Sequence, residues 1–194
     1  MNKSAVTQYP VLEVIRKRWS VRAFDEKPIA EETLHQFFEA ASWAPSSMNE
    51  QPWLYYYAHR ADTEKFNAMI NCLMPANQSW AKDAAVIILS AVRTKFEDGH
   101  QVGQINKYAL YDAGAANTNL MLDAAANTIF GHTMGGFHHD LAIQLFNLSE
   151  DIAPVVFIAL GYPGDPESLP ENLRVREGAT RSRKSVSGFT FRQK

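Results

Sequence analysis

The sequence predicts a single α+β domain in which helices cover a buried sheet. Two continuous apolar runs, Ala84–Val92 and Pro154–Leu160, are typical of buried strands. Lys107–Asn127 is rich in alanine and long enough for a major helix. Helical and strand-like segments follow one another without a regular βαβ rhythm, which favours layered α+β packing over a doubly wound sheet. Repeats, low-complexity tracts and linkers are missing, so residues 1–194 are interpreted as one domain.

The first half of the chain predicts two helices, a strand and a third helix. Val11–Arg18 carries apolar residues at 11, 12, 14 and 15, the spacing of a short helix. Ala30–Trp43 places its apolar residues on one stripe, and a proline two residues later stops it. Trp53–His59 is aromatic-rich and reads as a strand. Asp62 can cap a helix that runs to about residue 72.

The second half predicts two further helices around the second buried strand. Small residues in Lys107–Asn127 allow another backbone or a flat ligand to approach closely. Phe137–Phe146 reads as a helix that follows a double glycine. Glu167–Arg176 reads as a surface excursion, and Gly188–Arg192 as an extended tail.

Charge and hydropathy exclude several classes of partner. The chain has 19 basic and 21 acidic residues, a net charge of −2, so neither nucleic acid nor an anionic membrane is expected as a partner. Its apolar runs are shorter than the roughly 20 residues of a membrane span. The first ten residues lack an apolar signal core, and the single Cys72 fits a reducing compartment. We therefore expect a cytoplasmic protein.

Common catalytic motifs are missing. The sequence has no GxxxxGK[ST] phosphate loop, no GxGxxG after a strand and no Cys/His spacing suited to zinc. Adjacent residues of a helix point in different directions, so His138-His139-Asp140 is interpreted as surface histidines, and no metal is expected. Cys72 has no base nearby in sequence and is interpreted as a buried helix residue.

Three polar clusters remain, and the first is Arg18-Trp19-Ser20-Val21-Arg22 at the end of the first helix. Guanidinium forks bind phosphate oxygens in pairs, and a serine hydroxyl adds a further donor. The cluster can therefore surround an anion. Taken alone, the cluster is better interpreted as the solvated basic end of a helix.

The other two clusters lie in loops. Pro45–Trp53 is a polar loop between prolines, either a plain connection or a rigid binding loop whose amides suit the edge of a heteroaromatic ring. Arg181-Ser182-Arg183-Lys184 is, taken alone, a solvated basic tail. Each cluster is a weak signal, but the three in this order form a more specific pattern.

Together the clusters resemble the FMN-dependent nitroreductase family. The similarity rests on Arg18-x-Ser20-x-Arg22-x-Phe24 and on Pro45-Ser46-Ser47-x-Asn49-x-Gln51-Pro52-Trp53. Trp80-x-x-Asp83-Ala84, Asp112-Ala113-Gly114-Ala115-Ala116 and Gly135-Gly136-Phe137 extend it, so that it covers roughly residues 11–192. Trp19 departs from the family pattern because a second arginine or histidine is common there.

The resemblance implies a fold, an assembly and a cofactor. The fold is a nitroreductase-like three-layer sandwich, with a central, mainly antiparallel sheet flanked by helices. Two chains form an interlocked homodimer that exchanges C-terminal strands, with FMN at the subunit interface. The implied cofactor-binding residues are Arg18, Trp19, Ser20, Arg22, Pro45, Ser46, Ser47, Asn49, Asn77, Met134, Gly135, Gly136, Arg181, Arg183 and Lys184.

The resemblance also implies roles for these residues. Arg18 and Ser20 hold the phosphate and ribityl side, and Arg22 reaches toward the pyrimidine carbonyl. The loop from Pro45 to Asn49 comes from the opposite subunit, and the C-terminal basic residues close on the phosphate. The backbone of the double glycine lies near flavin N5, with Asn77 in contact with the flavin. Hydride transfer needs no acid or base from the protein, because the cofactor carries the chemistry.

The expected activity is transfer of hydride from NADH or NADPH, through flavin N5, to a nitroaromatic, a quinone or a similar small acceptor. One flavin face serves donor and acceptor in turn, which predicts ping-pong kinetics. Two alternatives stay open. The same scaffold could carry other redox chemistry, such as reductive dehalogenation, enone reduction or destruction of FMN. The chain could also form a flavin-binding dimer without turnover.

Overall fold

The computed structural model describes residues 3–97 and 99–193, and its centre is a four-stranded sheet. The strands lie in the order β1-β2-β4-β3, and each neighbouring pair is antiparallel. This confirms the predicted α+β class with an antiparallel sheet. The strands are β1 (Trp53–His59), β2 (Val86–Arg93), β3 (Phe130–Met134) and β4 (Ile152–Gly161).

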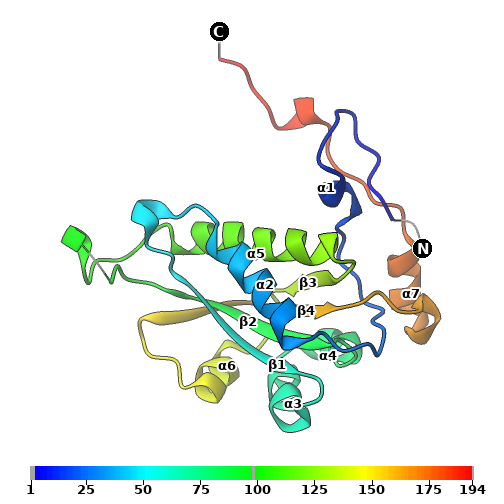
Figure 1. Cartoon of the computed structure of the whole chain (residues 1–194), viewed down its shortest axis with the longest axis horizontal. Coiled ribbons are helices and arrows are strands. Elements are labelled where there is room, and N and C mark those ends of the chain that lie inside the picture. The colour runs from blue at the N-terminus through cyan, green and yellow to red at the C-terminus, as the bar shows by residue number, and fades with distance from the viewer. Residues whose placement is uncertain (1–2, 98, 194) are drawn as a thin grey trace.

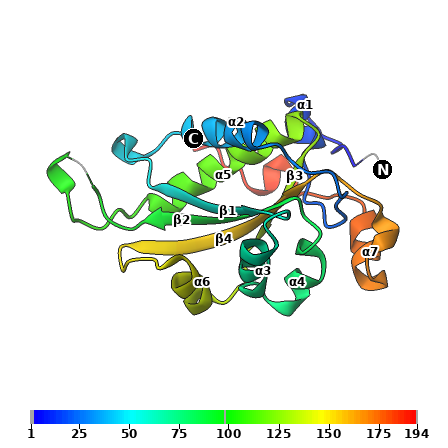
Figure 2. The same cartoon turned by 60° about the horizontal axis from the view of Figure 1, so that its bottom comes forward.

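Helices cover both faces of the sheet, as Figures 1 and 2 show. On one face lie α1 (Glu13–Lys17), α2 (Glu31–Ser42) and α5 (Ala109–Ala126). On the other lie α3 (Thr63–Asn71), α4 (Pro75–Ala81) and α6 (His139–Phe146). The chain is therefore a three-layer sandwich, and its core consists of two large apolar clusters on either side of the sheet and a small third one formed by Val92, Ala109 and Ala113.

The sequence of β2 explains these two clusters. Successive side chains of a strand point to opposite faces. Ile87 and Leu89 accordingly pack with the α3–α4–α6 side, whereas Val86 and Ile88 pack with the α2–α5 side. A strand that is buried on both faces has no polar side to present, which is why it reads as one unbroken apolar run.

Local signals fix several helices. The Asp62 side chain accepts a hydrogen bond from the backbone N–H of Lys65, so Asp62 caps α3 as predicted. The stripe of α2 buries Leu34, Phe37 and Ala41. Small side chains of α5 let α2 pack closely across it. In the described part of the chain, no helix has the length and apolarity needed to cross a membrane.

The structure corrects three expectations. Glu167–Arg176 is not a surface excursion: it contains most of helix α7 (Glu171–Gly178), which buries Leu173 and Glu177. Strand β3 and helix α4 were not predicted, because β3 is short and carries His132 and Thr133 among its few apolar residues. The predicted tail, Gly188–Arg192, begins at the last residue of a short 3-10 turn, Val186–Gly188, and continues without regular structure.

The N-terminal end of the described chain lies beside the end of α7 and the segment that follows it (Figure 1). The Lys3 ammonium donates to the backbone carbonyls of Glu177 and Ala179. Beyond this contact the C-terminal segment runs away from the body of the domain. Its side chains Phe189 and Phe191 are 59% and 81% exposed, so they have little to pack against within one chain.

Candidate functional site: a cation-lined cavity

A cavity of about 310 Å³ lies where the end of α1 meets the segment that follows α7. Its wall brings together the first and third polar clusters of the sequence, and it includes no acidic residue. Lys184 is not part of the wall. The lining residues are Lys3, Arg18, Trp19, Ser20, Arg22, Arg176, Ala179, Thr180, Arg181, Ser182 and Arg183.

Three of the lining arginines lack an acidic partner. Within residues 3–97 and 99–193, no carboxylate lies within ion-pair distance of Arg18, Arg181 or Arg183. Burial lowers the pKa of Arg18, and the positive charges of Arg181 and Arg183 lower it further. Because the positive charges of these arginines repel one another, the cluster favours a bound anion that would offset their charge.

Arg181 has a structural task within this cluster. Its guanidinium donates hydrogen bonds of 2.7, 2.7 and 2.9 Å to the carbonyls of Lys3, Arg16 and Arg18. These bonds join the C-terminal segment to the N-terminal one and build the wall of the cavity. Part of the Arg181 donor fork is therefore already engaged. Arg183, by contrast, bonds only the carbonyl of its neighbour Ser182 among the described groups.

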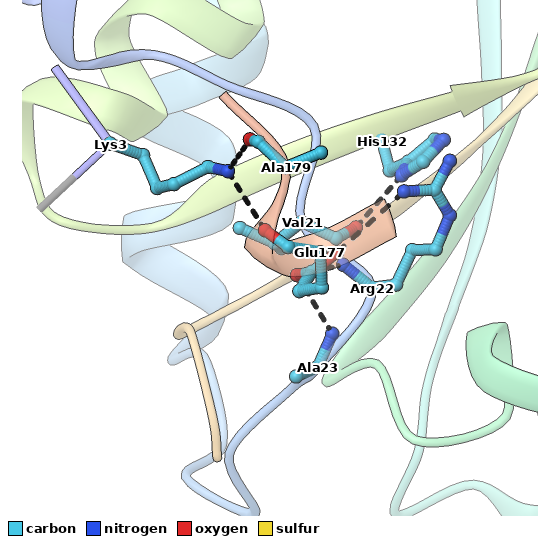
Figure 3. Close-up of polar contacts among 7 residues, drawn as sticks. All are labelled: Lys3, Val21, Arg22, Ala23, His132, Glu177 and Ala179. Atoms are coloured by element: carbon cyan, nitrogen blue, oxygen red, sulfur yellow. Dashed lines mark hydrogen bonds and ion pairs between the residues drawn. The ribbon is translucent and has the colours of Figure 1, made fainter. Parts of the chain in front are cut away.

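Arg22 lies beside the Glu177 carboxylate, with the His132 ring nearby (Figure 3). Its guanidinium is 3.6 Å from the Glu177 carboxylate and 5.9 Å from the centre of the Trp80 ring. His132 packs on Trp80 at 4.5 Å between ring centres, and its Nδ1 lies 2.8 Å from the Val21 carbonyl. A carbonyl only accepts, so Nδ1 must carry the proton. Burial lowers the pKa of His132 to about 4, with Arg22 contributing, so the ring is neutral at pH 7.

The second polar cluster lies elsewhere. The segment between α2 and β1 sits at one end of α5, while α1 and α7 lie toward the other end (Figures 1 and 2). The Ser47 N–H donates to the buried Asp112 carboxylate at 3.0 Å, which fixes the segment to the start of α5. Met48, Asn49 and Gln51 all have positive φ, near +50° to +60°. Non-glycine residues rarely adopt this conformation, and it clusters at functional sites.

The double glycine joins β3 to α6 and packs against α4. Asn77 donates from Nδ2 to the Gly136 carbonyl at 3.1 Å, and a Cβ on Gly136 would lie at only 3.1 Å from that nitrogen. Gly135 is exposed, with open space where its Cβ would stand. The backbone of Gly135 is thus accessible to a flat ligand. The Met134 side chain is buried and cannot itself reach a ligand at this surface.

The sequence alone missed four residues around the cavity. Lys3 and Arg176 line the wall, Glu177 contacts Arg22, and His132 bonds the carbonyl of Val21 next to it. One sequence feature could have drawn attention to Glu177: it stands directly before Gly178 and shortly before the basic segment 181–184. Because the residues before it were interpreted as a surface excursion, Glu177 was not considered as a buried acid.

Comparison with known proteins gives one family. The family model described as "Nitroreductase family" matches residues 15–162. A crystal structure titled as an oxidoreductase containing FMN superposes with a TM-score of 0.92 at 31% identity, covering 100% of this chain and 96% of that one. A protein of Methanothermobacter thermautotrophicus named "Putative NADH dehydrogenase/NAD(P)H nitroreductase" is 26% identical, over 82% of this chain and 81% of its own. A Desulfovibrio desulfuricans structure titled as a putative nitroreductase in complex with FMN shares the fold, with a TM-score of 0.74, 24% identity and coverage of 97% and 99%.

Proposed function

The chain belongs to the nitroreductase family, and on that premise we propose that it is an FMN-dependent oxidoreductase that uses NADH or NADPH to reduce a small organic acceptor. The cation-lined cavity carries this proposal, because several arginines without acidic partners need an anion. The FMN phosphate, close to two negative charges at neutral pH, has the charge and the oxygen acceptors that this wall can bind.

The donor set fits a phosphate group. Arg18 and Arg183 have no acidic partner in the described part of the chain, Arg183 has a single local bond to the Ser182 carbonyl, and Ser20 adds a hydroxyl at the same wall. Arg181 contributes its charge and holds the wall together through its carbonyl contacts. Lys184 follows the wall directly and could approach a bound phosphate from outside. Trp19 supplies an aromatic surface at the same wall.

We further propose that the complete site needs two copies of the chain. The loop from Pro45 to Asn49 and the cavity lie toward different ends of α5, an 18-residue helix about 27 Å long, so one copy does not unite them. In a homodimer, the loop of one subunit would face the cavity of the other, and the C-terminal segments would exchange. Large apolar side chains more than half exposed in one chain support such an interface. They include Leu12, Tyr108, Leu110, Tyr111, Phe189 and Phe191.

When bound, FMN supplies the redox chemistry, carrying hydride at N5 from the nicotinamide to the acceptor. The protein's own residues bind and orient. Arg22, anchored by Glu177, places a positive charge beside the ligand, and the accessible backbone at Gly135 offers N–H and C=O groups to the ring edge. We propose a nitroaromatic, a quinone or a similar compound as acceptor, with donor and acceptor using one face in turn.

The proposal is tested by reconstitution. Apoprotein should bind one FMN per chain and take on its yellow absorption spectrum. The loaded protein should then oxidise NADH or NADPH faster when a nitroaromatic or quinone is added, with parallel double-reciprocal plots. A colourless protein that takes up no FMN would overturn the proposal, and intersecting plots would overturn the shared face.

A further inference from the structure

Of the arginines that line the cavity, Arg22 alone pairs with a carboxylate within the described part of the chain. That carboxylate belongs to Glu177 in the last turn of α7, which is only 1% exposed (Figure 3). Oε1 of Glu177 accepts hydrogen bonds from the backbone N–H groups of Arg22 at 2.8 Å and Ala23 at 3.3 Å. Oε2 lies 3.6 Å from Nη1 of Arg22. One acid therefore holds both the backbone and the guanidinium of the same arginine.

The contacts of Oε2 indicate that Glu177 does more than join two segments. Oε2 is buried and has no hydrogen-bond partner among the described groups, so the Arg22 guanidinium is the cation that offsets its charge. A buried carboxylate costs several kcal/mol in desolvation unless it is paired. The two backbone bonds to Oε1 could be made equally by a neutral amide. The charge at position 177 is thus directed at Arg22.

Two rings without charge at pH 7 also lie near Arg22. The Trp80 ring lies under the guanidinium, and His132 packs against Trp80 with its Nδ1–H bonded to the Val21 carbonyl. Burial keeps His132 neutral at pH 7 because it lowers the pKa of the ring to about 4. The basic groups that also face His132 are Arg22 itself and Arg18. Glu177 is then the only charge of opposite sign in contact with Arg22 in the described structure.

We propose that Glu177 is a positioning residue that holds Arg22 at one side of the cavity and reduces the positive charge that Arg22 presents to a bound anion. This inference deepens the proposed function and rests on it for the flavin. Reduction adds negative charge to the pyrimidine ring, so a guanidinium released from Glu177 would stabilise the reduced cofactor more strongly. Glu177 therefore keeps the reduction potential of the bound flavin lower than Arg22 alone would set it.

The experiment uses Glu177→Gln, whose amide oxygen can keep the bonds to the backbone N–H groups while the negative charge is removed. Glu167→Gln is the matched control, because Glu167 is 71% exposed and pairs with Arg174 away from the cavity. Two quantities are measured: the affinity of apoprotein for inorganic phosphate, and the midpoint potential of bound FMN. Both are repeated in an Arg22→Ala background.

With Glu177→Gln, phosphate should bind severalfold more tightly and the midpoint potential should rise, whereas Glu167→Gln should change neither. Both effects should vanish in the Arg22→Ala background, since Glu177 acts through Arg22. The inference is overturned if neither quantity changes, or if the changes persist without Arg22. A purely structural role would instead loosen phosphate and flavin and leave the potential where it was.

Two further controls keep the outcomes distinct. If Glu177→Gln fails to fold by circular dichroism, Glu177→Asp replaces it, because the shorter side chain keeps the charge but withdraws it from Arg22. Its potential should shift in the same direction, and an unchanged potential would again overturn the inference. If wild-type protein binds no FMN, the proposed function fails, and the phosphate measurement alone still decides the role of Glu177.

Discussion

The backbone N–H of Ser47 donates to the carboxylate of Asp112 at 3.0 Å, and this bond ties the loop before β1 to the first turn of the central helix α5. Asp112 is 2% exposed, so its carboxylate has little contact with water and depends on hydrogen bonds such as this one. Positive φ values at three nearby residues show that the loop adopts a costly conformation. The bond therefore acts as an anchor for the loop.

Removing that anchor should weaken flavin binding without touching the phosphate wall. Asp112→Ala should lower FMN affinity about tenfold or more, since hydrogen bonds to charged groups contribute about 1.5–3 kcal/mol. Asp123→Ala on the same helix is the control, because Asp123 bonds the exposed Gln36 side chain instead. Fluorescence titration of the apoproteins with FMN gives the comparison. Equal losses in both variants would mean that the loop does not reach the flavin.

Arg18 and Arg183, which have no acidic partner among the described residues, should govern cofactor retention. Arg18→Ala or Arg183→Ala should each weaken FMN binding roughly ten- to hundredfold, because each removes a charged phosphate partner. Activity should return when excess FMN is supplied. Arg174→Ala, which breaks only the exposed pair with Glu167, should leave the affinity unchanged. A dissociation constant that does not move in either cavity variant would place the phosphate elsewhere.

Arg181 should behave differently from Arg183. Arg181→Ala loses three hydrogen bonds to carbonyls that join the two ends of the chain, which should lower the free energy of unfolding by about 1–3 kcal/mol. Arg183→Ala loses one local bond and should leave it nearly unchanged. Urea unfolding of both apoproteins makes the measurement. If both variants unfold at the same urea concentration, the three hydrogen bonds of Arg181 do not stabilise the fold.

The buried His132 predicts an acid-sensitive fold. Its pKa is about 4 in the folded protein, against about 6.5 in the unfolded chain, so the unfolded state binds the proton more readily. The stability that the neutral ring contributes is complete above about pH 6.5 and is lost as the pH falls toward 4, by up to about 3 kcal/mol. His132→Asn, whose amide can donate to Val21, should flatten this pH dependence, whereas His100→Asn on the exposed surface should not. Unfolding free energies measured across this range decide the matter.

The sequence predicted the parts of the fold that have a strong local pattern. The aromatic run predicted β1 with the bounds found, and the unbroken apolar run predicted β2 within two residues at its start and one at its end. Strand β3 escaped because it forms by pairing with β4, a tertiary effect that its five residues do not encode. Helix α7 escaped because most of its residues are polar and only Leu173 and Glu177 are buried.

For the candidate site, too, the sequence predicted only part of what the structure contains. The basic clusters were visible as residue types in sequence, and the structure brings Arg18, Arg22, Arg181 and Arg183 to one cavity. Their different tasks were not visible. That Arg181 bonds carbonyls and Arg22 pairs with a buried acid depends on where α7 and the N-terminal segment pack, which is a property of the folded chain.

Subunit mixing should reveal whether two chains share each site. One subunit would carry Arg18→Ala, and the other Asn49→Gly, a change that tolerates the positive φ of that position and removes the amide. If the cavity of one subunit meets the loop of its partner, the heterodimer has one intact site and one doubly altered site. Differently tagged, co-expressed chains should then bind one FMN with wild-type affinity. Two weakened sites, each with a single altered group, would place both groups within one chain.

The central claim, a flavin held between two copies of this chain, is tested most directly by sedimentation velocity of FMN-loaded protein, followed at a visible wavelength that only the flavin absorbs. We predict that the flavin sediments with a species of about 44 kDa, twice the 21.8 kDa of the chain, with one FMN per chain. Flavin that sediments tightly bound to a single-chain species would contradict the account, as would flavin that remains free at the meniscus.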